Sequence, residues 1–192
     1  MKPKTNYQNI PEKDQCQTPT YGLDPLLPYI KHGWHIWEPA CGDGQLVDAL
    51  RLVGHTVTGS DILDGHDFFT TTPRGIDAII TNPPYSTKYK WLARCYGLGL
   101  PFALLLPGET LFAVKGIDLF QRYGVELVIP IGRINFKMPN TGYEGGGAQF
   151  PTAWFTHKFN VGRQIAFKPF ERRPDGEPLK QKQITQLEMW TQ

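Results

Sequence analysis

Short apolar stretches with strand-like patterns alternate with helix-like segments from about residue 34 to residue 159, and this alternation constrains the fold most. Such an order is typical of an α/β domain, in which helices cover both faces of a mostly parallel sheet. The expected strands are residues 35–39, 56–59, 66–70 (a short third strand), 77–81, 102–106, 126–131 and 152–156. The expected helices are residues 45–53, a segment that begins after Ser86 or Thr87 and carries Tyr96, and residues 116–123.

Length and composition indicate one domain with a sizeable core, since 40% of the 192 residues are hydrophobic. We expect this domain to span residues 15–159, after an N-terminal arm of residues 1–14. Residues 160–192 mix basic, acidic and proline residues with few apolar side chains, and we expect a polar C-terminal arm there. The glycine-rich stretch 140–149 is expected to be a mobile loop.

The charge and the cysteines narrow the choice of partners. The formal net charge is +2, a mild basic excess that permits a nucleic-acid partner without requiring one. The three cysteines lie far apart with no C-x-x-C pair, so we expect neither a disulfide framework nor a metal site. A secretory h-region and a run of about 18 apolar residues are both missing. We therefore expect a soluble cytoplasmic protein with no membrane partner.

The tetrapeptide Asn82-Pro83-Pro84-Tyr85 follows an apolar run and presents an unusual hydrogen-bonding edge. Prolines lack a backbone N–H, and the residue before each proline prefers extended geometry, so this corner offers carbonyl acceptors without donors. Such an edge suits a planar group with an NH2, whose ring stacks on Tyr85. The same dipeptides are common in turns, so the tetrapeptide alone leaves both interpretations open.

A second motif, Glu38 to Gly44, lies where the first expected strand ends and the first helix begins. Ligands of open parallel sheets bind beyond the carboxyl ends of the strands, and Gly42 and Gly44 allow a close approach of the backbone. Asp61 ends the next strand, where a carboxylate can accept both hydroxyls of a ribose. A dinucleotide is less suitable, because the third glycine of its motif is missing and carboxylates would repel a pyrophosphate.

These motifs occur in an order that resembles the class I S-adenosylmethionine-dependent DNA methyltransferases of the adenine-N6 group. The resemblance includes Gln17-Thr18-Pro19, the turn from Glu38 to Gly44, Asp61, Asp67-Phe68 and Asn82 to Tyr85, and covers about three quarters of the chain. It implies a Rossmann-like class I methyltransferase fold, with a mixed, mostly parallel seven-stranded sheet and helices on both faces. It also implies S-adenosylmethionine as the cofactor.

By the same resemblance, Thr18 would contact the methionine carboxylate and Asp61 would hold the ribose. Asp67 would accept the adenine amino group, and Phe68 would lie against the adenine ring. The residues expected at the cofactor are Thr18, Glu38, Ala40, Gly42, Gly44, Asp61, Asp67 and Phe68.

The target base would be held by the residues of the tetrapeptide. The Asn82 side-chain oxygen and the Pro83 carbonyl would accept the two hydrogens of the amine, with Pro84 stiffening the corner. Tyr85 would stack on one face of the base, and Phe136 maps to the aromatic residue on its other side. Direct in-line displacement needs no covalent intermediate, but a base inside a duplex must first be flipped out.

DNA is the expected partner, with RNA as the nearest alternative and a non-catalytic nucleic-acid-binding subunit as a third. Arg133, Lys137, Lys88 and Lys90 are the candidates for phosphate contacts. The chain has little room for a target-recognition domain, so we expect a short site, low specificity, a homodimer or a recognition partner. Its size is that of a phage-borne enzyme that shields DNA from restriction in the host cytoplasm.

Overall fold

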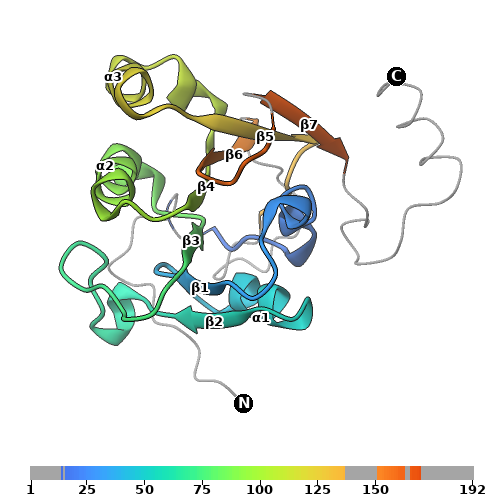
Figure 1. Ribbon diagram of the computed structural model, residues 1–192, viewed down its shortest axis with the longest axis vertical. Coiled ribbons are helices and arrows are strands. Elements are labelled where there is room, and N and C mark those ends of the chain that lie inside the picture. Colours follow the sequence, from blue (N-terminus) through green and yellow to red (C-terminus); the bar gives the residue numbers. More distant parts are fainter. Residues whose placement is uncertain (1–13, 15, 137–150, 163–164, 170–192) are drawn as a thin grey trace, which may run out of the picture.

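The computed structural model describes residues 14, 16–136, 151–162 and 165–169. It contains a seven-stranded sheet in the order β2-β1-β3-β4-β6-β5-β7 (Figure 1). The strands are β1 (His35–Glu38), β2 (Thr56–Gly59), β3 (Ala78–Thr81), β4 (Phe102–Pro107), β5 (Glu126–Ile131), β6 (Thr152–His157) and β7 (Ile165–Pro169). β6 pairs antiparallel with both β4 and β5, and the other strand pairs are parallel. The expected mixed, mostly parallel sheet is therefore confirmed.

The strand expected at residues 66–70 is absent, and the seventh strand of the sheet is β7, which was not expected. Residues 66–70 form a turn, because the Asp67 side chain accepts the Phe69 amide at 2.8 Å and its carbonyl accepts the amides of Thr70 and Thr71. These local bonds compete with strand pairing. β7 instead lies in the stretch expected to be a polar arm, and it pairs with β5 from Leu127 to Ile131. The sheet thus continues beyond residue 159, where the sequence pattern placed the end of the domain.

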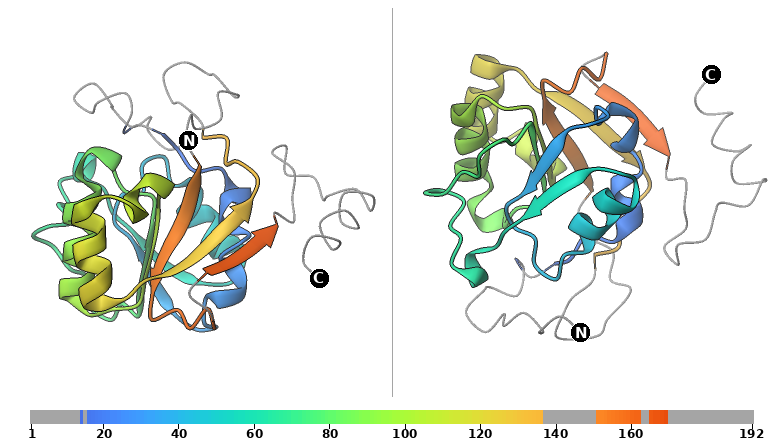
Figure 2. Two further views of the ribbon diagram at one scale, coloured as in Figure 1. Left: turned by 90° about the horizontal axis from the view of Figure 1, so that it is seen from above. Right: turned by 60° about the horizontal axis from the view of Figure 1, so that its bottom comes forward.

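The helices are short and lie on both faces of the sheet (Figure 2). The α-helices are α1 (Gln45–Leu52), α2 (Lys88–Leu98) and α3 (Val114–Tyr123). The 3-10 helices are η2 (Thr20–Leu23), η3 (Leu27–Tyr29), η4 (Ile62–Asp64), η5 (Tyr85–Thr87) and η6 (Gly108–Leu111). Within the described ranges, no helix is long and apolar enough to cross a membrane.

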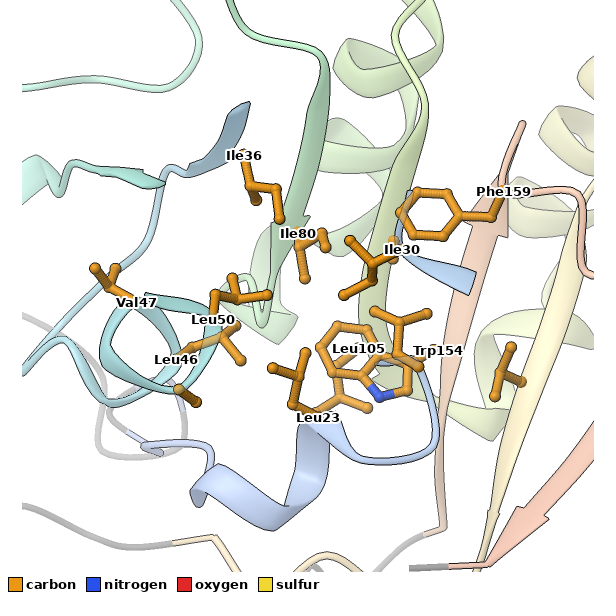
Figure 3. Packing of buried hydrophobic residues seen from close by; sticks show 14 of the residues in the cluster. Leu23, Ile30, Ile36, Leu46, Val47, Leu50, Ile80, Leu105, Trp154 and Phe159 are labelled. Atoms are coloured by element: carbon orange, nitrogen blue, oxygen red, sulfur yellow. The ribbon is translucent and has the colours of Figure 1, made fainter. Parts of the chain in front are cut away.

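Two buried clusters fill the space on either side of the sheet, because successive residues of a strand point to opposite faces. Ile36 and Ile80 belong to the cluster under α1 and η2, whereas their neighbours Trp37 and Ile79 belong to the cluster under α2. Figure 3 shows the first cluster, in which α1 and η2 side chains meet residues of β3, β4 and β6. The Trp154 indole also donates to the Gly22 carbonyl at 2.9 Å, which ties η2 to the sheet.

The strand order reverses between β1 and β3. The chain passes from β1 outward to β2 and then returns to place β3 on the other side of β1. In open sheets, such a switch point leaves a crevice beyond the carboxyl ends of the two central strands. Glu38 ends β1 and Asn82 follows β3, so both predicted motifs lie at this crevice.

Candidate functional site

A cavity opens beyond the carboxyl ends of β1, β2 and β3. Its volume is about 180 Å³. The described residues that line it are Asp14, Cys16, Gln17, Pro39, Ala40, Gly42, Asp61, Ile62, Leu63, His66, Asp67, Phe68, Phe69, Asn82, Pro84, Thr87 and Trp91. Three of these carry carboxylates and none is Lys or Arg. The lining therefore suits a positively charged ligand better than a phosphate.

The turn after β1 is held by backbone hydrogen bonds and two left-handed glycines. Gly42 has φ +48° and Gly44 has φ +84°, and the Gly44 amide donates to the Cys41 carbonyl at 2.7 Å. Gly42 lines the cavity, whereas Gly44 is the N-cap residue of α1. The Gln17 amide group lies only 2.5 Å from where a Cβ on Gly42 would stand. Position 42 thus favours glycine for its backbone angle, and an added Cβ would also displace the flexible Gln17 side chain.

Asp61 holds this turn and η4 together. One carboxylate oxygen accepts the Gly42 amide at 2.9 Å, and the other accepts the Leu63 amide at 3.0 Å. The side chain is 7% exposed and lines the cavity. A carboxylate has about four lone-pair sites, so two acceptor positions remain for a ligand. The residue predicted to hold a ribose therefore also organises the loop around it.

Glu38 is a buried carboxylic acid beside the cavity. Burial raises its pKa to about 8, although hydrogen bonding from Thr81 and from the Ala40 amide, the latter at 3.1 Å, lowers it. Burial, followed by the nearby carboxylates of Glu38 and Asp61, also raises the pKa of Cys41 to about 12. This negative environment would be relieved by a cation near the end of β1.

The apolar part of the cavity differs in detail from the prediction. Phe68 is only 3% exposed, and its ring stacks on Trp91 with centroids 4.0 Å apart. Ile62 and Phe69 also line the cavity and are 58% and 39% exposed. These two apolar side chains lie uncovered at the cavity, which favours a planar apolar ligand group there. Asp67 borders the same region.

Asn82 lies at the other side of the cavity, directly after β3. Its amide nitrogen donates to the Cys16 carbonyl at 3.5 Å, a long hydrogen bond. Its amide oxygen is buried and has no hydrogen-bond partner among the described residues. The Pro84 carbonyl accepts the Thr87 amide at 3.2 Å, so the corner is stabilised by η5. A buried acceptor without a donor is costly, which marks it as a site for a ligand donor.

The two aromatic residues predicted to stack on a base, Tyr85 and Phe136, are not among the residues that line this cavity. Tyr85 begins η5 and packs against the cluster under α2, and burial raises the pKa of its hydroxyl. Phe136 is 5% exposed and belongs to the opposite cluster, together with Ile134. Neither ring lines the cavity. Thr18 is also buried outside the cavity lining, and its hydroxyl has no partner in the described part of the chain.

Of the predicted basic residues, Lys88, Lys90 and Arg133 belong to the described part of the chain, and none of them lines the cavity. The Lys88 ammonium lies 3.4 Å from Glu109 and 5.1 Å from the centre of the Tyr89 ring, so it is already engaged. Arg133 is exposed, and Lys137 lies outside the described residues. The described residues include no group of three His, Cys, Asp or Glu side chains that could hold a metal ion.

Sequence reasoning did not single out several residues that line the cavity, namely Asp14, Cys16, Ile62, Phe69 and Trp91. Ile62 and Phe69 each directly follow a predicted cofactor residue, so their positions in the motifs carried a usable signal. Asp14 and Cys16 reach the site only through contacts more than 60 residues away in sequence, which no local pattern reveals.

Comparison with known proteins supports the fold. No family model matches the sequence, and no curated protein shows significant similarity to it. A type I restriction-modification methyltransferase subunit from Streptococcus thermophilus superposes with a TM-score of 0.56 at 17% identity, over 91% of this chain and 52% of that one. A protein from Listeria monocytogenes, proposed as a class I S-adenosylmethionine-dependent methyltransferase, gives a TM-score of 0.54 at 14% identity, over 96% and 74%.

These likenesses identify the architecture as the Rossmann-like class I methyltransferase fold. The chain spans about half the length of the Streptococcus subunit. The activity of that larger protein therefore bears on this chain only as a proposal.

Proposed function

We propose that this protein transfers a methyl group from S-adenosylmethionine to the exocyclic amino group of adenine in DNA. The observation that carries the proposal is the buried Asn82 side-chain oxygen, which lacks a donor among the described residues and lies at the cavity. An NH2 group directed at this corner would supply that donor. The adenine and the DNA follow from the sequence resemblance described above.

The residues at the cavity fit the cofactor. S-adenosylmethionine supplies, when bound, an electrophilic methyl group on a sulfonium, and it also carries an ammonium. Asp61 provides negative charge next to the glycine turn, where such cations would be held, and the buried Glu38, whose pKa is raised to about 8, would ionise when a cation is bound beside it. Ile62, Phe69 and Asp67 offer an apolar border and an acceptor that suit an adenine ring and its amino group.

The chain's own contribution to catalysis is to align and activate the target amine. The lone pair of an aromatic amine is delocalised into its ring, so the nitrogen is a weak nucleophile. Asn82 and the Pro83 carbonyl would accept its two hydrogens and thereby localise the lone pair towards the methyl donor. The nitrogen becomes acidic as it gains the methyl group, so a strong base is not required. Alignment and fixed dipoles each contribute on the order of several kcal/mol in such sites.

Radiolabelled cofactor and matched DNA and RNA substrates test this function directly. The purified protein is incubated with cofactor labelled in its methyl group and with unmethylated DNA or total RNA. Digestion to nucleosides and mass spectrometry then identify the modified base. We expect N6-methyladenine in DNA.

Two results would change the proposal. Label in RNA but not in DNA would move the assignment to an RNA methyltransferase. Cofactor binding with no transfer to either nucleic acid would favour a non-catalytic subunit.

A further inference from the structure

We propose that Asp14 is a positioning residue that fixes the orientation of the Asn82 amide by anchoring the group of Asp14, Cys16 and Gln17, here called the strap, at the cavity that these three residues line. The inference rests on the proposed function, because it assigns the Asn82 oxygen to the target amine. It adds to that site a residue that lies outside the sequence motifs quoted above.

Three contacts attach the strap to both loops of the site. The Asp14 carboxylate accepts the Ser86 hydroxyl at 2.6 Å and the Ser86 amide at 3.2 Å. The Cys16 carbonyl accepts the Asn82 amide nitrogen at 3.5 Å. The Gln17 side-chain oxygen accepts the Asp43 amide at 3.2 Å, on the glycine turn. The strap therefore bridges the loop after β1 and the loop after β3.

The orientation of the Asn82 amide decides what the site can bind. With its nitrogen on the Cys16 carbonyl, the side chain presents its oxygen as the remaining group. A rotation by 180° would present an NH2 to a substrate NH2, and two donors cannot form a hydrogen bond. The Cys16 carbonyl thus selects the acceptor end of the amide.

Asp14 affects the orientation of the Asn82 amide because the hydrogen bond from Asn82 to the Cys16 carbonyl is long and depends on the position of the strap. At 3.5 Å, the contact between Asn82 and Cys16 is at the limit of hydrogen bonding, so a small outward shift of the strap would break it. The short bond between Asp14 and Ser86 attaches the strap next to the same corner, four residues after Asn82 in the chain. Ser86 is exposed, so this bond contributes little to folding but still positions the Cys16 carbonyl.

The test is a double-mutant cycle on Asp14 and Ser86, read out by steady-state kinetics. We expect Asp14→Ala and Ser86→Ala each to lower kcat about tenfold, the order of effect of a hydrogen bond to a charged group. Thermal stability should stay near wild type in both variants, and Ser86→Ala, whose side chain does not line the cavity, should also leave cofactor affinity unchanged. The double variant, which combines Asp14→Ala and Ser86→Ala, should have a kcat no lower than that of either single variant, because both changes remove the same contact.

Two further variants separate positioning from a general loss of structure. Asp14→Asn keeps an oxygen for Ser86 and should recover much of kcat. Asp118→Ala removes an exposed carboxylate on α3 and should leave kcat unchanged. A kcat for Asp14→Ala within twofold of wild type, or losses that add fully in the double variant, would overturn the inference while the proposed function stands. Absence of transfer by the wild-type protein would overturn both.

Discussion

The two loops that form the site are built in opposite ways. In the loop after β1, the polar groups bond to one another: the Ala40 amide to Glu38, the Gly42 amide to Asp61 and the Gly44 amide to Cys41. In the loop after β3, Asn82 keeps a buried oxygen with no partner among the described residues. These three amides of the first loop have hydrogen-bond partners without a ligand, whereas the Asn82 oxygen of the second loop has none among the described residues.

Under the proposed function, this difference would let one crevice hold two ligands with separate requirements. A cofactor must bind before each turnover, and a loop that is already ordered by its own hydrogen bonds loses little conformational entropy when the cofactor binds. A reacting amine is served by an acceptor that is satisfied only when the substrate arrives. We therefore expect changes in the first loop to alter affinity and stability, and changes in the second to alter the rate.

The largest effect should come from Asn82→Ala. Removal of the unpaired oxygen should lower kcat about a hundred- to a thousandfold, by analogy with the loss of one fixed dipole in an active site. Cofactor affinity by calorimetry and the melting temperature should hardly change. Gln121→Ala removes an exposed carboxamide on α3 and is the control. An active Asn82→Ala enzyme would remove the contrast between the loops.

Asp61→Ala should act on affinity and on stability together. Its carboxylate accepts two backbone amides, so its loss leaves both of these donors without partners and removes the acceptor proposed for the ribose. We expect cofactor binding to weaken by about 1 to 3 kcal/mol, with a comparable loss in the free energy of unfolding. Calorimetry and urea denaturation measure the two. Unchanged affinity would count against the proposed cofactor site.

A comparison of Gly42→Ala with Gly54→Ala tests whether the glycine turn after β1 is needed for cofactor binding. Both glycines have positive φ, but only at Gly42 would a Cβ meet another group, the Gln17 amide at 2.5 Å. Each change should cost about 1 to 2 kcal/mol of stability. Only Gly42→Ala should also weaken cofactor binding, because the turn must move. Equal affinity in the two variants would show that the cofactor does not contact this turn.

The effect that depends on pH concerns Glu38. Its pKa of about 8 lies above its ordinary value, so the folded state binds a proton more tightly than the unfolded state. The stability that this proton contributes is complete below about pH 4.5 and is lost as pH rises towards 8, by less than about 1.4 kcal/mol per pH unit. Calorimetry at pH 5 and 8 should show a shallower decline for Glu38→Gln. Identical slopes would contradict the buried, protonated acid.

Much of the fold could be predicted from the sequence, because six of the strands have apolar patterns bounded by turn residues. The strand expected at residues 66–70 was wrong, since two consecutive phenylalanines do not reveal that Asp67 captures the following amides. β7 was missed for a related reason. Its five residues are framed by charged and proline-rich sequence, and only pairing with the distant β5 makes them a strand.

The site could be predicted only in part. Motif order placed Glu38, Gly42, Asp61 and Asn82 around one crevice, because the ends of parallel strands meet there. The order of the motifs along the chain does not indicate in which direction each side chain points. Tyr85 follows the two prolines as expected, yet its ring packs into the interior, and the roles of these residues stay predictions.

The position of β6 has a consequence for synthesis of the chain. β5 has only β6 and β7 as neighbours in the sheet, and both follow it in sequence. A nascent chain on the ribosome therefore holds Leu127 and Val128, which are buried in the finished protein, without a partner strand until Thr152 and later residues emerge. Chains stalled before that point should recruit chaperones, and release of the last strands should end that dependence.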